Sequence, residues 1–211
     1  MKDLGELKFF LDIEFSRSEK GMHLCQRKYA FELISKVGLT GSKPSDTPLE
    51  FNHKLTSVEY DNFVKTDQTS DDTLLQDKGC NHRIVGRLLY LTMARPDLAF
   101  VVQLLSQHMH DPKMSHLKKT TRMIKYIKGT VGLGLFMPVD DKKELTTFCD
   151  FDWASCVETR KSVSFYVVEL GDALISWKFK KQQTVSRSSA EAEFRSMTST
   201  VAEITWLTGF T

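Results

Sequence analysis

Apolar and polar residues alternate along residues 8–26, on both sides of a polar turn sequence at residues 18–21. A period of two around a short turn predicts a β-hairpin. Beyond it, apolar residues from Tyr29 to Val37 recur at helical spacing, and Gly38 follows where a helix often ends in a left-handed residue. The N-terminal part is therefore expected to form a hairpin that leads into a short helix.

A polar stretch separates this part from the next apolar pattern. Pro44 and Pro48 oppose regular structure, and the polar character continues to about residue 82. Its acidic residues outnumber its basic ones, which are Lys65 and Lys78. The acidic residues are Glu59, Asp61, Asp67, Asp71, Asp72 and Asp77. This pattern predicts a solvated acidic linker over residues 56–82.

Helical periodicity returns at Arg83. The sequence Arg95-Pro96 interrupts it, and the proline suits the first turn of a second helix. A third helix is expected after Pro112, with Gly129 as its terminator. The middle block, residues 83–137, is therefore predicted to be helical.

The last part of the chain changes from a period of two to helical spacing. Three short alternating stretches joined by turn sequences predict an antiparallel meander, and Ser188 with Glu191 forms a capping box that begins a helix. The expected strands are residues 144–150, 162–170 and 173–180, and the expected helix is residues 189–208. The fold class is therefore α+β, with a β-hairpin plus helix, a helical connection and a β-β-β-α unit.

Composition narrows the class of protein. The 211 residues include 41% apolar side chains and carry a net charge of +2, so the chain can bury a core and is not a disordered polyelectrolyte. Its charge-free stretches reach about half of the roughly 20 residues in a membrane helix, and the charged start is unlike a secretory signal. Four cysteines without CxxC spacing indicate reduced thiols and no structural zinc. We expect an intracellular protein, cytoplasmic or nuclear, with no membrane partner.

Two acidic positions are candidates for metal-assisted chemistry. Asp150 ends the first strand of the meander, and Glu193 lies in the first turns of the following helix. Carboxylates on a strand end and on a helix packed across that sheet can hold Mg²⁺, which prefers oxygen ligands and assists phosphodiester cleavage. The alternative is that Asp150 caps a strand and Glu193 is a solvated residue near a helix start. The residues by themselves favour this second interpretation.

Cationic side chains are concentrated in two places. The candidates for nucleic-acid contact are Lys118, Arg122 and Lys125 on one face of the predicted 113–128 helix, and Lys180, Lys181 and Arg187 near the last strand. Such faces suit a phosphate backbone, because each neutralised phosphate releases counterions. The alternative is that both are ordinary solvated surfaces.

Other catalytic classes lack sequence support. No G-x-S-x-G elbow occurs, and the glycines within residues 129–134 lack the Lys-Ser/Thr continuation of a phosphate-binding loop. The sequence therefore points away from triad hydrolases and nucleotide-driven motors.

Five blocks of the sequence resemble one known family. They are Met1-Lys2-Asp3-Leu4-Gly5-Glu6-Leu7-Lys8, Gln26-Arg27-Lys28-Tyr29-Ala30, Thr92-Met93-Ala94-Arg95-Pro96-Asp97, Cys149-Asp150-Phe151-Asp152-Trp153-Ala154 and Ser186-Arg187-Ser188-Ser189-Ala190-Glu191-Ala192-Glu193. In this order they resemble the Pol polyprotein of copia-type LTR retrotransposons of plants. The resemblance spans essentially the whole chain.

The resemblance implies a division of the chain and a set of roles. The implied regions are the end of a reverse transcriptase region at residues 1–55, the acidic linker at 56–82, a helical connection at 83–137 and a partial RNase H-like domain at 138–211. It further implies that Asp150 and Glu193 are catalytic carboxylates and Mg²⁺ ligands. The implied partners are an RNA–DNA hybrid or other nucleic acid and the rest of a Pol polyprotein. The family's polymerase aspartates and later RNase H carboxylates have no counterpart in this sequence.

Several positions depart from the family. It usually has glycine at the places of Asp12 and Phe165, and an aromatic residue followed by a basic one at the place of Asn81-His82. A strand glycine often marks a close backbone approach, so Phe165 is expected to be hard to accommodate. With the missing carboxylates, these departures predict a truncated remnant of a reverse transcriptase and RNase H polyprotein that is inactive by itself. Two alternatives stay open: a non-catalytic nucleic-acid-binding module that uses the basic 113–128 helix, and a chain without a stable fold, because the apolar face of its last helix would be uncovered.

Overall fold

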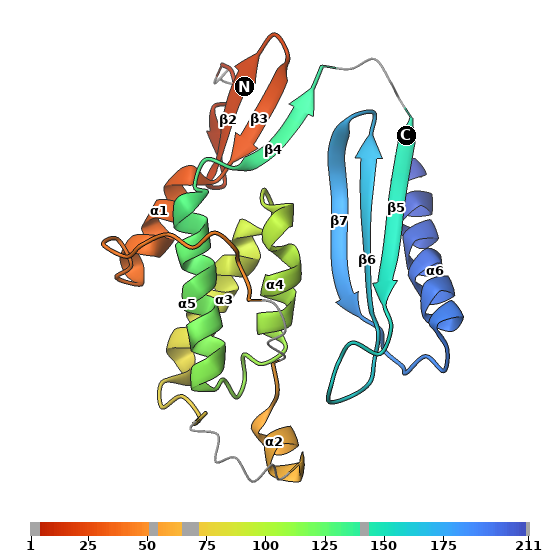
Figure 1. Cartoon of the computed structure of the whole chain (residues 1–211). Coiled ribbons are helices and arrows are strands. Elements are labelled where there is room, and N and C mark those ends of the chain that lie inside the picture. Colours follow the sequence, from red (N-terminus) through yellow and green to blue (C-terminus); the bar gives the residue numbers. More distant parts are fainter. Residues whose placement is uncertain (1–4, 51–54, 65–71, 140–143, 210–211) are drawn as a thin grey trace. The chain divides into compact units, whose positions relative to one another are not determined.

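The computed structural model describes residues 5–50, 55–64, 72–139 and 144–209, which form two compact units (Figure 1). The N-terminal unit comprises residues 5–18 and 22–135, and the C-terminal unit comprises residues 19–21 and the described residues from 136 onward. The structure is mixed α and β, with two antiparallel sheets. In the described residues the elements are β1 (Phe9–Phe10), β2 (Ile13–Ser18), β3 (Gly21–Cys25), α1 (Arg27–Lys36), α2 (Val58–Val64), α3 (Lys78–Leu91), α4 (Pro96–Ser106), α5 (Met114–Gly129), β4 (Gly134–Pro138), β5 (Leu145–Asp152), β6 (Val163–Leu170), β7 (Ala173–Lys181) and α6 (Ser189–Thr208).

The first sheet has the strand order β1-β2-β3-β4 and contains the predicted hairpin as β2 and β3. A second tight turn joins β1 to β2, and its two residues, Leu11 and Asp12, have φ values of 47° and 57°. A two-residue hairpin turn with positive φ at both positions favours glycine, and aspartate is among the residues that tolerate it best. The departure at Asp12 therefore falls where the backbone explains a family preference for glycine. Gly134 permits the close approach of β4, because an added Cβ would lie 2.0 Å from the Leu24 carbonyl oxygen.

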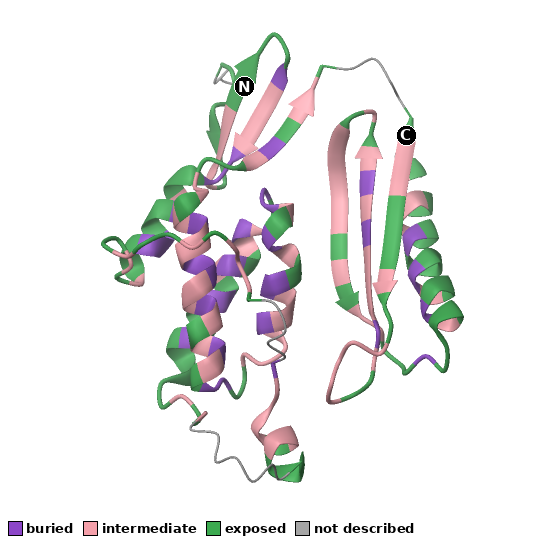
Figure 2. Ribbon diagram, in the orientation of Figure 1, coloured by how far each residue is buried: buried purple, intermediate pink, exposed green. Residues whose placement is uncertain are grey.

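Helices α1, α3, α4 and α5 enclose the hydrophobic core of the N-terminal unit. Its centre is made of fully buried aliphatic side chains, visible as purple bands on these helices in Figure 2. They include Leu33, Leu88, Leu98, Met123, Ile124 and Ile127. Helix α3 begins at Lys78, earlier than the predicted Arg83, because the Asp77 side chain accepts a hydrogen bond from the Cys80 backbone N–H at 3.0 Å and caps the helix.

A buried arginine ties α4 to the end of α5. The Arg95 guanidinium pairs with both carboxylate oxygens of Asp97 at 2.8 Å. It also donates to the carbonyl and hydroxyl oxygens of Thr130, each at 2.9 Å. The side chain of Arg95 is only 3% exposed, so these bonds satisfy a charge that would otherwise be costly to bury.

The predicted acidic linker, residues 56–82, contains regular structure in the parts that the structure describes. Residues 58–64 form α2, a bridge pairs Leu74 with Lys113, and α3 begins at Lys78. Two of the linker's acidic residues, Asp61 and Asp72, pair with the Lys113 ammonium. The acidic excess therefore compensates a buried cation, while Asp67 and Asp71 lie outside the described residues.

The C-terminal unit is the predicted meander followed by the predicted helix. The strand order is β5-β6-β7, and Asp150, Phe165 and Phe179 lie side by side in register. The expectation that Phe165 fits poorly is wrong, because its ring stacks on Phe179 with centroids 5.4 Å apart. The predicted capping box forms in part: the Ser188 hydroxyl caps the helix by accepting from the Glu191 N–H, but the Glu191 carboxylate accepts from the Arg187 N–H in place of the Ser188 N–H.

Candidate functional site

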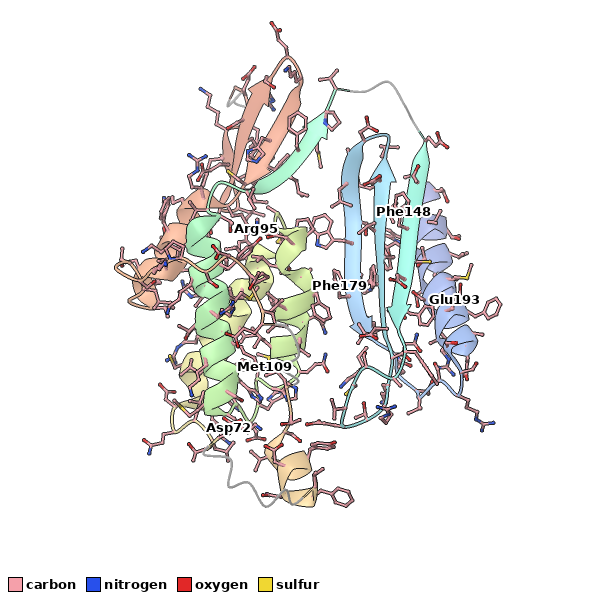
Figure 3. The ribbon with its side chains drawn as sticks, in the orientation of Figure 1. Asp72, Arg95, Met109, Phe148, Phe179 and Glu193 are labelled. Atoms are coloured by element: carbon pink, nitrogen blue, oxygen red, sulfur yellow. The ribbon has the colours of Figure 1, made fainter. Side chains whose placement is uncertain are left out.

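Asp150 and Glu193 lie on neighbouring elements of the C-terminal unit. Asp150 is near the end of β5 and Glu193 is in the first turns of α6. One helical turn beyond Glu193, the buried hydroxyl of Ser196 donates to the Asp150 carbonyl oxygen at 2.8 Å. This bond sets the turn of α6 that carries Glu193 against the end of β5, and Figure 3 shows Glu193 on the helix and Phe148 on the adjacent strand.

The two carboxylates flank one edge of the sheet. Helix α6 covers the face that carries the buried side chains of Tyr166 and Val168, since Ser176 on that face donates to Glu203 of α6 at 2.9 Å. Alternation along the strands places Asp150 on the opposite face, beside Phe165. Because β5 is at the edge of the described sheet, a ligand shared by the two acidic side chains would have to sit at that edge.

The donor set suits a hard cation only in part. Both carboxylates are exposed, and one Asp150 oxygen accepts from the Phe151 backbone N–H at 2.7 Å, which leaves lone pairs for a ligand. Oxygen donors with access to water are what Mg²⁺ prefers. Among the described residues, however, no three His, Cys, Asp or Glu side chains come together to hold a metal ion.

The basic residues of the C-terminal unit do not form one surface. Lys180 pairs with Ser164 in register and Lys181 with Val163, so the two lysines point to opposite faces of the sheet. Lys180 and Arg187 are exposed. The Lys181 ammonium lies 3.6 Å from the Cys156 sulfur.

This contact has an electrostatic effect on the cysteine. Burial by itself would raise the pKa of the Cys156 thiol, but hydrogen bonds from Thr159 and the Lys181 charge outweigh burial and lower it. Lys181 is therefore partly engaged within its own unit.

Some cationic residues at the start of α5 and along it form bonds within the protein, and others are left to contact a ligand. Lys113 is buried between Asp61 and Asp72, and Lys128 donates to the carbonyl oxygens of residues 39, 40 and 42. Arg122 donates to Glu50 at 2.8 Å and to Thr47 at 2.9 Å. Of the three predicted contact residues on this helix, the side chains of Lys118 and Lys125 make no hydrogen bond or ion pair with another described residue, while the Arg122 side chain is held in place.

These residues line a pocket of about 680 Å³ between α5 and a loop. Its lining residues are Lys43, Pro44, Ser45, Asp46, Leu117, Lys118, Thr121, Arg122 and Lys125, which we call the basic pocket. Sequence reasoning missed Lys43, because its loop reaches α5 only through tertiary contacts such as the Ser45 N–H bond to the Lys125 carbonyl at 3.2 Å. No local sequence signal identifies such a contact.

Sequence reasoning also missed a buried histidine at the start of α5. His116 is 1% exposed, and its Nδ1 accepts from the Lys113 backbone N–H at 3.1 Å. Its Nε2 lies 3.1 Å from the Thr56 carbonyl oxygen, which requires the proton on Nε2. Burial, and then the nearby His108 and Lys113, lower the pKa of His116 to about 4. The arrangement is typical of a neutral, structural histidine.

The chain is similar in sequence to several known proteins. The chain is 37% identical to an uncharacterized mitochondrial protein of Arabidopsis thaliana over 98% of its own length and 80% of that protein. It is 38% identical to the retrovirus-related Pol polyprotein from transposon RE1 of the same plant, and 29% identical to that from transposon TNT 1-94 of Nicotiana tabacum. These alignments cover 98% and 100% of this chain but 13% and 16% of the polyproteins.

Two other comparisons return nothing. No family model matches the sequence, and no solved structure matches it. In the residues that the structure describes, no helix has the length and apolar character to cross a membrane. The near-complete coverage at this identity, in the block order of the sequence, shows that the chain belongs to the family of retrovirus-related Pol polyproteins from plant transposons.

Proposed function

We propose that the C-terminal unit is an RNase H-like β-β-β-α unit of a Pol polyprotein, and that it acts on the RNA strand of an RNA–DNA hybrid. In this proposal Asp150 and Glu193 supply two carboxylate ligands of a Mg²⁺ site. The observation that carries it is the Ser196 bond to the Asp150 carbonyl, which holds the two acidic positions on either side of the β5 edge. Membership of the Pol family supports the choice of a nucleic-acid substrate.

The two carboxylates would bind and orient the cation, and a bound Mg²⁺ would supply charge to activate water and stabilise the leaving oxygen of a phosphodiester. Because such sites use several carboxylates and the described residues bring together only two, we infer that the chain by itself turns over hybrid too slowly to detect. A further ligand would come from another part of a polyprotein, of which this chain spans 13% in RE1.

The phosphate backbone would be held by cations of the same unit. Lys180 and Arg187 are the available candidates because both are exposed, and Lys181 would contribute less because of its contact with Cys156. The alternative of a non-catalytic nucleic-acid-binding module is favoured by one specific observation, the basic pocket in the N-terminal unit.

The test combines metal binding with cleavage. Mn²⁺, used as a paramagnetic substitute for Mg²⁺, is expected to bind the wild-type chain weakly, and Asp150→Asn or Glu193→Gln is expected to reduce that binding at least about tenfold. Asp172→Asn is the matched control, because Asp172 lies in the β6–β7 turn at the other end of the sheet. A labelled hybrid incubated with the chain and Mg²⁺ is expected to stay intact.

One outcome would count against the metal site, and another would count against the inferred inactivity of the chain by itself. Mn²⁺ binding that is equal in the wild type and in both carboxylate variants would show that Asp150 and Glu193 do not bind the metal ion. Hybrid cleavage that disappears in Asp150→Asn would support the metal site but overturn the inference that the chain is inactive by itself.

A further inference from the structure

We propose that the basic pocket of the N-terminal unit is a separate binding site for the phosphodiester backbone of a nucleic acid. Lys43, Lys118 and Lys125 would contact successive phosphates, and Arg122 would form a preset wall of the site. The choice of nucleic acid as the polyanion rests on the proposed function. The site itself rests on the contacts of the N-terminal unit.

The charge around the pocket favours an anionic ligand. Of the nine lining residues, four are cationic and Asp46 is the one that is acidic. Arg122 is already paired with Glu50, so its charge contributes little outside that pair. Lys43, Lys118 and Lys125 remain: Lys43 and Lys118 are exposed, and Lys125 is half-buried. The structure gives these three lysines no acidic partner among the described residues.

The spacing of the lysines favours a polymer over a single phosphate ion. Lys118 and Lys125 lie two turns apart on one face of α5, which corresponds to about 10 Å along the helix at 1.5 Å per residue. Lys43 approaches from the opposite wall of the pocket, on the loop. To contact one phosphate ion, the Lys118 and Lys125 side chains would both have to bend toward a single point, whereas consecutive phosphates of a strand match the spacing of their backbone positions.

The walls of the pocket are held before any ligand binds. The Ser45 N–H bond to the Lys125 carbonyl joins the loop to α5, and a Cβ added to Gly129 would lie 3.2 Å from the Pro44 Cβ, so loop and helix are in close contact. The bonds from Arg122 to Glu50 and Thr47 fix the same loop farther along. Preset walls lower the entropy lost on binding.

The test measures the salt dependence of hybrid binding with a chelator present, so that no metal site contributes. Binding of a labelled hybrid of about 20 base pairs is followed by anisotropy from about 50 to 200 mM KCl. Wild type is compared with the triple variant Lys43→Gln, Lys118→Gln, Lys125→Gln. The control triple variant replaces Lys8, Lys20 and Lys36, three exposed lysines away from the pocket, and changes the net charge by the same amount.

Each phosphate contact contributes about 0.9 to the slope of log affinity against log salt. We expect the pocket variant to lose about 2 to 3 from that slope and the control variant to lose less than about 1. Both variants should keep a melting temperature close to that of the wild type. The pocket lysine side chains make no hydrogen bond or ion pair with another described residue, and the control variant loses only the exposed pair of Lys36 with Glu32. A pocket variant with the slope of the control, or a wild-type chain that binds no hybrid, would overturn the proposal.

Two further arms separate this site from its alternatives. If orthophosphate at constant ionic strength displaces the hybrid from the wild-type chain, the pocket takes small anions and the proposal is wrong. Asp150→Asn should bind hybrid as the wild type does in chelator. Mn²⁺ binding that is unchanged in Asp150→Asn, together with the expected salt slope of the wild type, would therefore refute the carboxylate site and leave the basic pocket standing.

Discussion

Acidification is expected to destabilise the N-terminal unit through one buried imidazole, that of His116. The ring closes the start of α5 by accepting the Lys113 N–H at Nδ1 while Nε2 donates to the Thr56 carbonyl. A second proton would turn Nδ1 from an acceptor into a donor and break the first of these bonds. Folding therefore requires the neutral ring.

The sign and size of the effect follow from the two pKa values. The pKa of His116 is about 4 in the folded chain against 6.5 ordinarily, chiefly because of burial. Its contribution to stability is thus complete above pH 6.5 and is lost as the pH falls toward 4. Each pH unit in this interval is equivalent to about 1.4 kcal/mol, so about 2 kcal/mol is lost by pH 5 and about 3 kcal/mol in all.

The assay compares urea unfolding at pH 8 and pH 5 for the wild type and for His116→Gln. Glutamine at the third helical position can still accept the N-cap N–H but does not titrate in this range. Far-UV circular dichroism follows the helices of the N-terminal unit. Fluorescence provides an internal reference, because Trp153, Trp177 and Trp206 all lie in the C-terminal unit.

Asp72 and Lys113, which lie near the ring, differ from it in the direction or range of their titration. Burial alone would raise the pKa of Asp72, but hydrogen bonds from Ser115 and Lys113 outweigh it and lower the pKa, so the contribution of Asp72 is complete above its ordinary pKa of 3.8. Burial alone would lower the pKa of Lys113, and its bonds to Asp61 and Asp72 outweigh that and raise it. His110→Gln is the control variant, because it removes an exposed imidazole and leaves the buried one in place. If His116→Gln loses as much stability between pH 8 and pH 5 as the wild type, the reasoning is refuted.

Further substitutions test contacts of the fold. Gly134→Ala should lower the Tm by several degrees, because the new Cβ would lie 2.0 Å from a β3 carbonyl oxygen. Gly86→Ala meets nothing within 4 Å and should raise the Tm, because alanine stabilises a helix by about 0.5–1 kcal/mol relative to glycine; calorimetry that orders the two variants the other way would contradict this. Arg95→Met should cost about 2 to 3 kcal/mol in urea unfolding, since it leaves Asp97 without its cation, and adding Asp97→Asn should restore part of that loss. Ser196→Ala should lower the stability of the C-terminal unit by about 1 kcal/mol, followed by tryptophan fluorescence, and an unchanged midpoint would show that the bond to β5 does not hold the helix.

Local patterns were sufficient to predict most elements of this fold. The meander, the helix cap at Ser188 and the break at Pro96 each depend on residues within a few positions of one another, and all three appear in the structure. The placement of Asp150 and Glu193 on a strand end and a following helix was predictable for the same reason. Their metal ligation stays a prediction.

Features set by distant residues could not be read from the sequence. Lys113 looked like one more surface cation, but it is buried because Asp61, 52 residues upstream, pairs with it. The basic pocket likewise needs Lys43 beside α5, which only the folded chain reveals. In both cases the sequence showed the charged residues but not the distant residue that contacts them in the folded chain.

The start of α5 has a consequence for the order of folding. Its Ser115 N–H is capped by Asp72, 43 residues upstream, and its His116 ring reaches Thr56, 60 residues upstream (Figure 3 labels Asp72). Closing loops of this length costs chain entropy before the contacts form. The later turns of α5, which carry Ile124 and Ile127 into the core, can assemble first. The first turn should then be the last part of the helix to gain protection from hydrogen exchange during refolding, and the first to lose it when the native state opens.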